Sequence, residues 1–226
     1  MMLRIPALLS AQEVRECRQA MEAADWQDGR MTAGHLAAQV KSNLQLPVDS
    51  PLAAQMGNLI LDKLGHNPLY LSAALPLRVL PPRFNRYEGG GTYGNHIDNA
   101  LFVIPGTAIK VRTDVSTTVF FSEPDEYDGG ELIVEDTFGH QSVKLVAGDA
   151  IVYPGSSLHR VNPVTRGTRY ASFFWTQSLI KSDEQRRLLF DLDQSIQQLT
   201  ADHPAHSKLS ALSGTYHNLL RMWSEA

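Results

Sequence analysis

The sequence predicts an all-β core with flanking helices, and three observations lead to this fold class. Residues 77–178 contain short β-branched or aromatic runs that are separated by turns. Residues 1–76 and 179–226 instead show the three- and four-residue apolar spacing of amphipathic helices. Strands and helices do not alternate along the chain, which argues against a doubly wound parallel sheet. Short strands at this density are typical of a β-sandwich or barrel.

The N-terminal region, residues 1–76, is expected to contain two helices that pack on the core. Ser10 and Glu13 have the spacing of a capping box. A second helix is expected to begin at Ser50 and Pro51, a favourable cap and first residue, and to end near Gly65. The expected apolar faces comprise Val14, Cys17, Met21 and Ala24 in the first helix, and Leu52, Met56, Leu59, Ile60 and Leu64 in the second.

The core region, residues 77–178, is expected to form short strands. Glycine-containing stretches such as 89–91, 128–130 and 165–167 provide the turns between them. The strand-like runs are 75–86, 116–122, 131–136, 141–145, 150–153 and 169–177.

The C-terminal region, residues 179–226, is expected to form two helices separated at Pro204. Ser182 and the three residues after it form another capping pattern. These helices are expected either to cover the barrel or to mediate a homodimer. Their apolar positions are Leu188, Leu189, Leu192, Ile196 and Leu199, followed by Leu209, Leu212, Tyr216, Leu219, Leu220 and Trp223.

The composition excludes several classes of protein. The net charge of −4 and the absence of a basic run argue against a nucleic-acid partner. The single cysteine, Cys17, provides neither an intramolecular disulfide nor a cysteine-rich zinc site, and it fits a small apolar residue in a reducing compartment. No apolar run is long enough to span a membrane, and the N-terminus lacks the apolar stretch of a signal peptide. We therefore expect a cytoplasmic protein.

Three residues suggest a metal site. His96 and Asp98 are two positions apart, so on a strand both side chains would project from one face. His159 follows the run 149–158 and is the candidate third ligand. Two histidines and one carboxylate form the facial triad of non-haem Fe(II) oxygenases, which leaves coordination positions open. Taken alone, the His-x-Asp pair is a weak signal, and an exposed polar strand explains it more simply.

Arg169 strengthens this interpretation. It follows His159 by ten residues, and the turn-forming stretch 162–167 lies between them. A hairpin centred near Val164 would place His159 and Arg169 opposite each other on adjacent strands, with both side chains in one cavity. The planar guanidinium binds a carboxylate bidentately, which suits a dicarboxylate that also chelates the metal. The alternative is an ion pair between Arg169 and an Asp or Glu of the protein.

These residues together resemble the PKHD-type hydroxylases, relatives of prolyl 4-hydroxylases within the Fe(II)/2-oxoglutarate oxygenases. The similarity runs from about residue 77 to residue 177 and continues less specifically through the C-terminal region. The segments that carry it are 86–99, 128–132, 148–161 and 164–169.

The resemblance implies a double-stranded β-helix, or jelly roll, with flanking helices. It implies that His96, Asp98 and His159 bind Fe(II) and that Arg169 binds the distal carboxylate of 2-oxoglutarate. Tyr87 lies where relatives often place a tyrosine of the co-substrate pocket. The implied reaction consumes O2, hydroxylates a substrate, and releases succinate and CO2, with L-ascorbate keeping the iron reduced.

The sequence is also compatible with two other functions, and it does not identify the substrate. One alternative is a cupin-like metal enzyme that does not use 2-oxoglutarate, and the other is a non-catalytic sensor of iron or a 2-oxo acid. The main substrate is not identified by the sequence, which leaves a prolyl side chain, a free amino acid and a siderophore-like metabolite possible.

The remaining polar candidates have less weight. Asn99, Arg112 and Asp114 follow the metal motif and are candidates for substrate contact, although a solvated loop is the simpler reading. Gly89–Gly91 lacks the lysine and the strand–helix context of a phosphate loop, so we expect a loop beside the metal-bearing strand. The histidines expected on the surface or in packing roles are His35, His66, His140, His203, His206 and His217.

Overall fold

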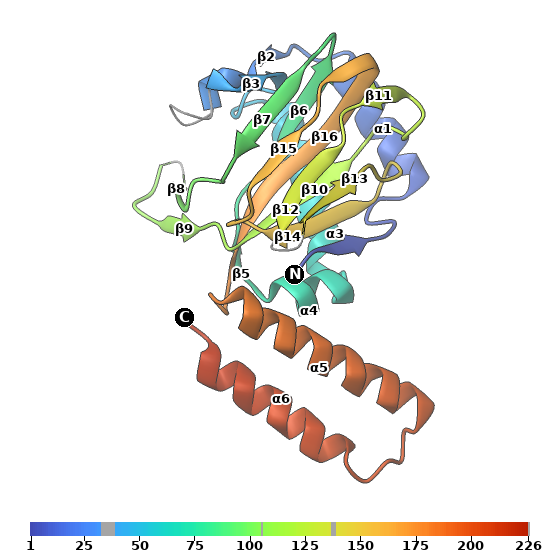
Figure 1. Ribbon diagram of the computed structural model, residues 1–226, viewed down its shortest axis with the longest axis vertical. Helices are drawn as coiled ribbons and strands as arrows, with labels where there is room; N and C mark the ends of the chain where they lie inside the picture. The colour runs from blue at the N-terminus through green and yellow to red at the C-terminus, as the bar shows by residue number, and fades with distance from the viewer. Residues whose placement is uncertain (33–38, 105, 137–138, 226) are drawn as a thin grey trace.

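Two β-sheets face each other in the computed structural model, with helices against one of them and a helical hairpin at one end (Figure 1). The structure describes residues 1–32, 39–104, 106–136 and 139–225. Strands thus dominate the middle of the chain and helices its ends, which confirms the predicted all-β core with flanking helices. Among the described residues, no helix has the length and apolar character needed to cross a bilayer.

The larger sheet has nine strands among the described residues, in the order β1-β14-β10-β16-β6-β4-β2, and β11 and β5 also pair with β16. Its central strand β16 pairs with β10 on one side and β6 on the other. The strands are β1 (Leu3–Ile5), β2 (Gln27–Asp28), β4 (Leu44–Gln45), β5 (Pro76–Val79), β6 (Arg83–Glu88), β10 (Val115–Phe120), β11 (Tyr127–Gly129), β14 (Ala150–Pro154) and β16 (Val164–Ser178).

The smaller sheet has five strands among the described residues, in the order β13-β12-β15-β7-β3. A core of buried side chains from both sheets, including Tyr87, Phe120, Leu132 and Val161, fills part of the space between them. The strands are β3 (Lys41–Ser42), β7 (Thr92–His96), β12 (Leu132–Asp136), β13 (Gly139–Val143) and β15 (His159–Val161). A separate ribbon is formed by β8 (Leu101–Val103) and β9 (Lys110–Arg112).

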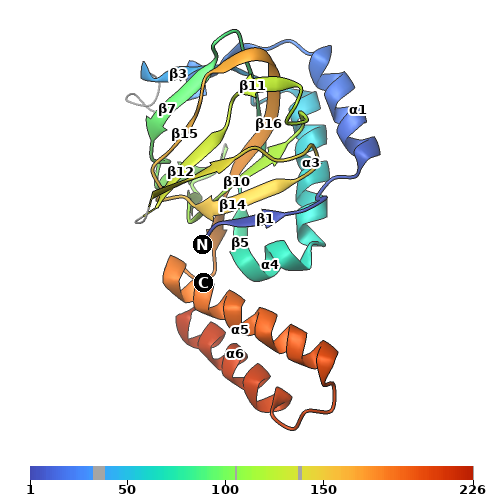
Figure 2. The same cartoon turned by 45° about the vertical axis from the view of Figure 1, so that its right-hand side comes forward.

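Of the helices that the structure describes, three pack against the outer face of the larger sheet (Figure 2). Helix α1 (Ala11–Glu22) begins at the predicted capping box, in which the Ser10 hydroxyl accepts from the backbone N–H of Glu13. Helix α3 (Pro51–Gly65) begins at Ser50 as predicted, and α4 (Pro68–Ala74) follows it. Strand alternation supplies the other half of this core, because Tyr170 and Phe174 of β16 face the helices.

The C-terminal helices α5 (Asp183–Asp202) and α6 (Leu209–Trp223) form a hairpin that extends away from the sheets (Figures 1 and 2). A small core that includes Leu75, Ile180 and Leu189 joins it to the remainder of the protein. The buried guanidinium of Arg186 donates to the carbonyl oxygens of Ile180 and Lys181 at 2.7 and 2.9 Å, which fixes the start of α5. Because the described residues of the hairpin contact the remainder of the protein only around this small core, the alternative in which these helices cover the barrel is not supported.

The structure corrects the predicted elements in three further places. The N-terminal region contributes strands as well as helices, because β1, β3 and β4 pair with β14, β7 and β6. The run 75–86 forms two strands, because strand pairing is interrupted at Pro81 and Pro82 and resumes at Arg83. Leu188 lies outside the apolar stripe and is 59% exposed.

Candidate active site

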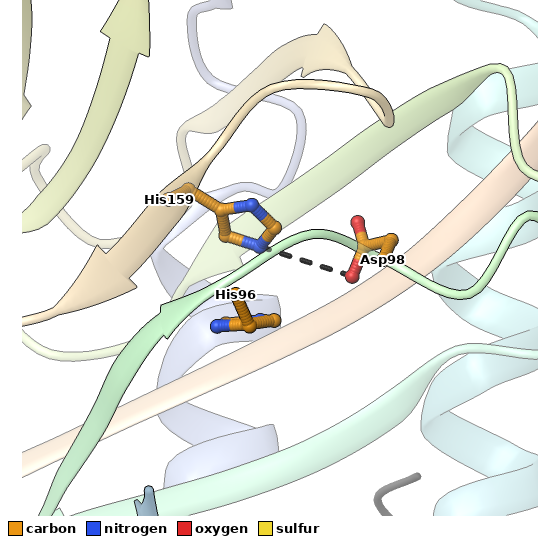
Figure 3. Close-up of side chains that lie close together, drawn as sticks. All are labelled: His96, Asp98 and His159. Atoms are coloured by element: carbon orange, nitrogen blue, oxygen red, sulfur yellow. Dashed lines mark ion pairs between the residues drawn. The ribbon is translucent and has the colours of Figure 1, made fainter. Parts of the chain in front are cut away.

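The ligating atoms of His96, Asp98 and His159 lie within 4.8 Å of one another (Figure 3). His96 is the last residue of β7 and His159 the first of β15, and these two residues are paired across the adjacent strands. Asp98 lies beyond the end of β7, so the prediction that a single strand presents both His96 and Asp98 is wrong. The chain after β7 nevertheless brings the Asp98 Oδ1 to 3.8 Å from the His159 Nε2.

Backbone carbonyl groups orient both imidazoles. The Nδ1 of His96 hydrogen-bonds the carbonyl oxygen of Gly94 at 2.8 Å, and the Nδ1 of His159 hydrogen-bonds that of Ser157 at 2.9 Å. Since a carbonyl oxygen only accepts, each Nδ1 carries the proton and each Nε2 keeps its lone pair. Both histidines are thereby held in the tautomer that can bind a metal through Nε2.

Burial favours the neutral form of the His96 imidazole. The pKa of His96 falls to about 3, mainly because burial disfavours the imidazolium and also because His159 is close. The ring of Tyr93 stacks on that of His96 with centroids 3.6 Å apart. The Oδ2 of Asp98 is buried with no hydrogen-bond partner among the described residues. A neutral imidazole beside an unsatisfied carboxylate oxygen is the arrangement expected where a cation binds.

Arg169 faces the same cavity from the opposite sheet. The predicted hairpin is wrong, because β15 pairs with β7 and β12 whereas β16 pairs with strands of the larger sheet. Arg169 pairs with Tyr87 of β6, and both side chains line the cavity that also contains His96, Asp98 and His159. The expectation of a shared cavity is therefore right, although the two sheets provide the geometry in place of a hairpin.

The surroundings of Arg169 leave its charge available to a ligand. Its side chain is 2% exposed, and its Nε has no hydrogen-bond partner among the described residues. Within the same part of the chain, no carboxylate lies within ion-pair distance of it, so the alternative of a protein ion pair is not supported. The rings of Tyr87 and Phe120 each have their centroid 5.3 Å from its guanidinium carbon. A buried arginine in this setting requires an anion.

Tyr87 lies deep in the cavity. Its side chain is 1% exposed, and its hydroxyl oxygen accepts a hydrogen bond from the Asn85 Nδ2 at 3.1 Å. Burial raises the pKa of this phenol, while the nearby Arg169 opposes that shift. The phenol therefore stays protonated and can donate to an oxygen of a ligand.

Several lining residues were missed by the sequence analysis. On β6 and β16, side chains at alternate positions point into the cavity, a period-two signal that the sequence carries but that does not say which face is inward. Lys41, from the two-residue strand β3, has no sequence signal at all. The lining residues not predicted include Lys41, Arg83, Asn85, Phe102, Ser116, Thr118, Tyr153, Phe173 and Trp175.

The secondary candidates separate clearly. Asn99 lines the cavity. Asp114 instead pairs with Arg112 at 2.6 Å and accepts a hydrogen bond from the backbone N–H of Ser178 at 2.9 Å, so Arg112 and Asp114 have structural roles.

The stretch 89–91 forms the turn between β6 and β7. Cys17 is buried on α1 as expected. Among the histidines, His35 lies outside the described residues, and those that are exposed as expected are His66, His140, His203, His206 and His217.

The donor set fits Fe(II) and a dicarboxylate. Two imidazole nitrogens and one carboxylate oxygen suit this ion, and three protein ligands leave positions open for a chelating co-substrate and O2. The buried guanidinium of Arg169 on the facing sheet suits the second carboxylate of the same molecule.

Comparison with known families agrees with this chemistry. The profile of the 2OG-Fe(II) oxygenase superfamily matches residues 82–177, and that of the PKHD-type hydroxylase C-terminal domain matches residues 183–225. A PKHD-type hydroxylase from Delftia acidovorans is 81% identical over 226 residues, with 100% of both chains covered. One from Pseudomonas aeruginosa strain LESB58 is 60% identical over 225 residues, also with 100% of both chains covered.

Solved structures agree in fold. A prolyl-4-hydroxylase from Pseudomonas putida superposes with a TM-score of 0.51 and 22% identity, covering 78% of this chain and 92% of that chain. The predicted double-stranded β-helix with helices at both ends is thereby confirmed.

Proposed function

The chain belongs to the PKHD-type hydroxylases of the 2OG-Fe(II) oxygenase superfamily, and from this premise we propose which residues carry the reaction. The protein is an Fe(II)- and 2-oxoglutarate-dependent hydroxylase. We propose that His96, Asp98 and His159 bind the iron and that Arg169 binds the distal carboxylate of 2-oxoglutarate. The observation that carries this proposal is the convergence of three ligating atoms within 4.8 Å in the cavity that Arg169 also lines.

The side chains have distinct tasks in this proposal. When bound, iron and 2-oxoglutarate supply the oxidising chemistry, in which O2 is consumed, a C–H bond is hydroxylated, and succinate and CO2 are released. The carbonyl groups of Gly94 and Ser157 hold the two imidazoles with Nε2 toward the cavity. Asp98 supplies the negative charge that offsets the metal. The aromatic side chains of Phe102, Phe173 and Trp175 line part of the cavity, and by excluding water there they limit side reactions.

Tyr87 is proposed as a second residue of the co-substrate pocket. It is the cross-strand neighbour of Arg169, and its buried hydroxyl keeps a donor available. A phenol here can donate to the carboxylate that Arg169 pairs with, so Tyr87→Phe should weaken 2-oxoglutarate binding by about tenfold, the loss of one hydrogen bond to a charged group. Anaerobic titration with 2-oxoglutarate measures this change.

The proposal is tested by adding Fe(II) and 2-oxoglutarate to the protein without O2. We expect a visible charge-transfer band, its loss in His159→Ala, and no change in His140→Ala, in which an exposed histidine of the same sheet is removed. A cupin-like enzyme that does not use 2-oxoglutarate would give no band. Admitting O2 should then release succinate slowly even without the main substrate, whereas a non-catalytic sensor would show the band and release none.

Further properties expected from the sequence remain part of the proposal. L-Ascorbate should sustain turnover by reducing the iron, which succinate release with and without ascorbate measures. The division into residues 1–76, 77–178 and 179–226 is proposed as three regions of one catalytic unit, of which the last should be removable only with a loss of stability. Cell fractionation tests the proposed cytoplasmic location.

A homodimer through the helical regions is also proposed. Leu188 on α5 and Met222 on α6 are 59% and 74% exposed, which supports an apolar contact there. Light scattering on the wild type and on a Leu188→Glu, Met222→Glu double variant measures the oligomeric state. A wild-type monomer would contradict the proposal.

A further inference from the structure

Besides Arg169, two other cationic side chains line the cavity, Lys41 and Arg83. Along β16, Arg169 pairs with Tyr87 and Phe173 pairs with Arg83, so the two arginines lie four strand positions apart. At about 3.3 Å per residue, this separation is about 13 Å. The proposed role of Arg169 in co-substrate binding therefore involves neither Lys41 nor Arg83.

Lys41 occupies the side of the cavity next to the metal cluster. It is 5% exposed, and its Nζ lies 5.0 Å from the ring centroid of Tyr93, which stacks on His96, and 5.8 Å from that of Phe173. Its pKa is lowered to about 8, first by burial and then by the charge of Arg83, and Asp28 opposes this shift only weakly. Burial and the repulsion between these two cations both favour an anionic ligand in this part of the cavity.

Arg83 lies beside two aromatic rings, those of Phe102 and Trp175, which stack on each other with their centroids 4.5 Å apart. Its guanidinium carbon is 5.4 Å from the ring centroid of Phe102 and 5.6 Å from that of Trp175. In the described part of the chain, no carboxylate and no hydrogen-bond acceptor pairs with Arg83. The indole Nε1 of Trp175 is buried and likewise has no hydrogen-bond partner among the described residues. One planar cation and one N–H donor are thus both available to an acceptor.

An apolar groove adjoins the cavity of the metal cluster. Arg83, Phe102 and Trp175 line both the cavity and this groove, which also includes residues of α3. The remaining lining of that groove is mainly apolar and includes Leu46, Pro47, Val48, Ala54, Leu61 and Val103. A molecule whose anionic group lies beside Arg83 would therefore find apolar surface for the rest of its body.

We propose that the main substrate is a carboxylic acid with an apolar body, and that Lys41 and Arg83 bind its carboxylate. This inference rests on the proposed function, because it takes Arg169 to be occupied by 2-oxoglutarate. The guanidinium of Arg83 presents the planar fork that a carboxylate matches, and Lys41 adds a point charge on the metal side. The apolar body lies against Phe102, Phe173 and Trp175. A cationic substrate would be repelled by the same pair.

The test measures binding without turnover. The protein is loaded with Ni(II), which does not activate O2, and with saturating 2-oxoglutarate. It is then titrated calorimetrically with a panel of aliphatic and aromatic monocarboxylic acids, each paired with its primary amide. A second arm uses short peptides with an apolar C-terminal residue, as the free acid and as the amide, which distinguishes a small acid from a peptide terminus. The variants are Arg83→Gln, Lys41→Gln and, as a control, Arg78→Gln, which removes an exposed arginine of β5.

We expect acids to bind at least about tenfold more tightly than their amides, since a charge-assisted pair is worth more than the neutral contact. Arg83→Gln and Lys41→Gln should each remove that preference, while amide binding and 2-oxoglutarate binding stay as in the wild type and Arg78→Gln changes nothing. If Arg83→Gln does not fold, Lys41→Gln decides the outcome.

Three results would overturn the inference: no acid in either arm preferred over its amide, a preference that survives both substitutions, or acids that displace 2-oxoglutarate and so bind at Arg169. Failure of the proposed function is recognised separately. In that case the anaerobic Fe(II) and 2-oxoglutarate band is absent from the wild type, whatever the acid panel gives.

Discussion

Replacing Arg169 with alanine tests the co-substrate site directly. The side chain is 2% exposed, its Nε has no partner among the described residues, and the rings of Tyr87 and Phe120 flank its guanidinium. A ligand carboxylate would therefore lose its main cationic partner in a nearly dry site. Because the metal cluster lies on the opposite sheet, iron binding should persist in this variant.

The magnitude follows from the cost of leaving a buried charge unpaired. Truncating one partner of a buried, hydrogen-bonded charge pair costs about 2–5 kcal/mol. At 1.4 kcal/mol per factor of ten, the dissociation constant of 2-oxoglutarate should rise by about 30-fold to several thousand-fold. Arg169→Lys keeps the charge but not the fork, so we expect it to fall between the wild type and the alanine variant.

The assay is an anaerobic titration of the Fe(II)-loaded protein with 2-oxoglutarate, followed by the visible charge-transfer band. The matched control is Arg166→Ala, three residues earlier on the same strand, where the guanidinium is exposed and pairs with Asp128 at 2.7 Å. We expect the control to bind 2-oxoglutarate as the wild type does. An Arg169→Ala protein that binds iron and keeps the wild-type affinity for 2-oxoglutarate would refute the assignment.

Three other predictions concern the metal and stability. Asp98→Ala should weaken Fe(II) binding by at least about 100-fold, because the only anionic ligand is lost, and calorimetric metal titration measures this. Gly167 has φ +70°, and a Cβ there would lie 2.0 Å from the Glu126 carbonyl oxygen. Gly167→Ala should therefore lower the free energy of unfolding, measured in urea, by about 2–3 kcal/mol. The control is Gly214→Ala in α6, where a Cβ meets nothing within 4 Å, and it should raise the free energy of unfolding by up to about 1 kcal/mol. The pKa of Glu13 is lowered from 4.5 to about 2, mainly by Lys63, so its carboxylate stabilises the fold above pH 4.5 and progressively less toward pH 2. The stability gap between wild type and Glu13→Gln should be about 1 kcal/mol at pH 7 and shrink as the pH falls below 4.5, and a constant gap would contradict this.

Local signals predicted the helices well. The caps at Ser10, Ser50 and Ser182 all accept a hydrogen bond from the expected backbone N–H. Capping depends on residues within one turn, so it can be recognised without knowledge of the remaining fold. Helix α4 was missed because Pro68–Ala74 is too short to establish a period.

Long-range pairing was less predictable. Strands β3 and β15 have two and three residues, so no alternation can be read from them. The connection from His159 to Arg169 looked like a hairpin because it contains turn residues, but residues 164–167 belong to β16 and pair with β11. The chain crosses from one sheet to the other between β15 and β16. This crossing depends on pairing with strands that are distant in the sequence, which local patterns do not reveal. The residues of the candidate site were identified correctly as neighbours, although the local geometry that joins them was not.

The proposed metal ligands and the proposed co-substrate residue Arg169 lie on separate sheets, which has a consequence for redesign. Strands β7 and β15 present His96 and His159, whereas β6 presents Arg83 and β16 presents Arg169, Phe173 and Trp175. We expect a library restricted to Arg83, Phe173 and Trp175 to alter which molecules the enzyme accepts while His96, Asp98, His159, Tyr87 and Arg169 stay in place. Reactivity and selectivity can thus be evolved one at a time in this scaffold.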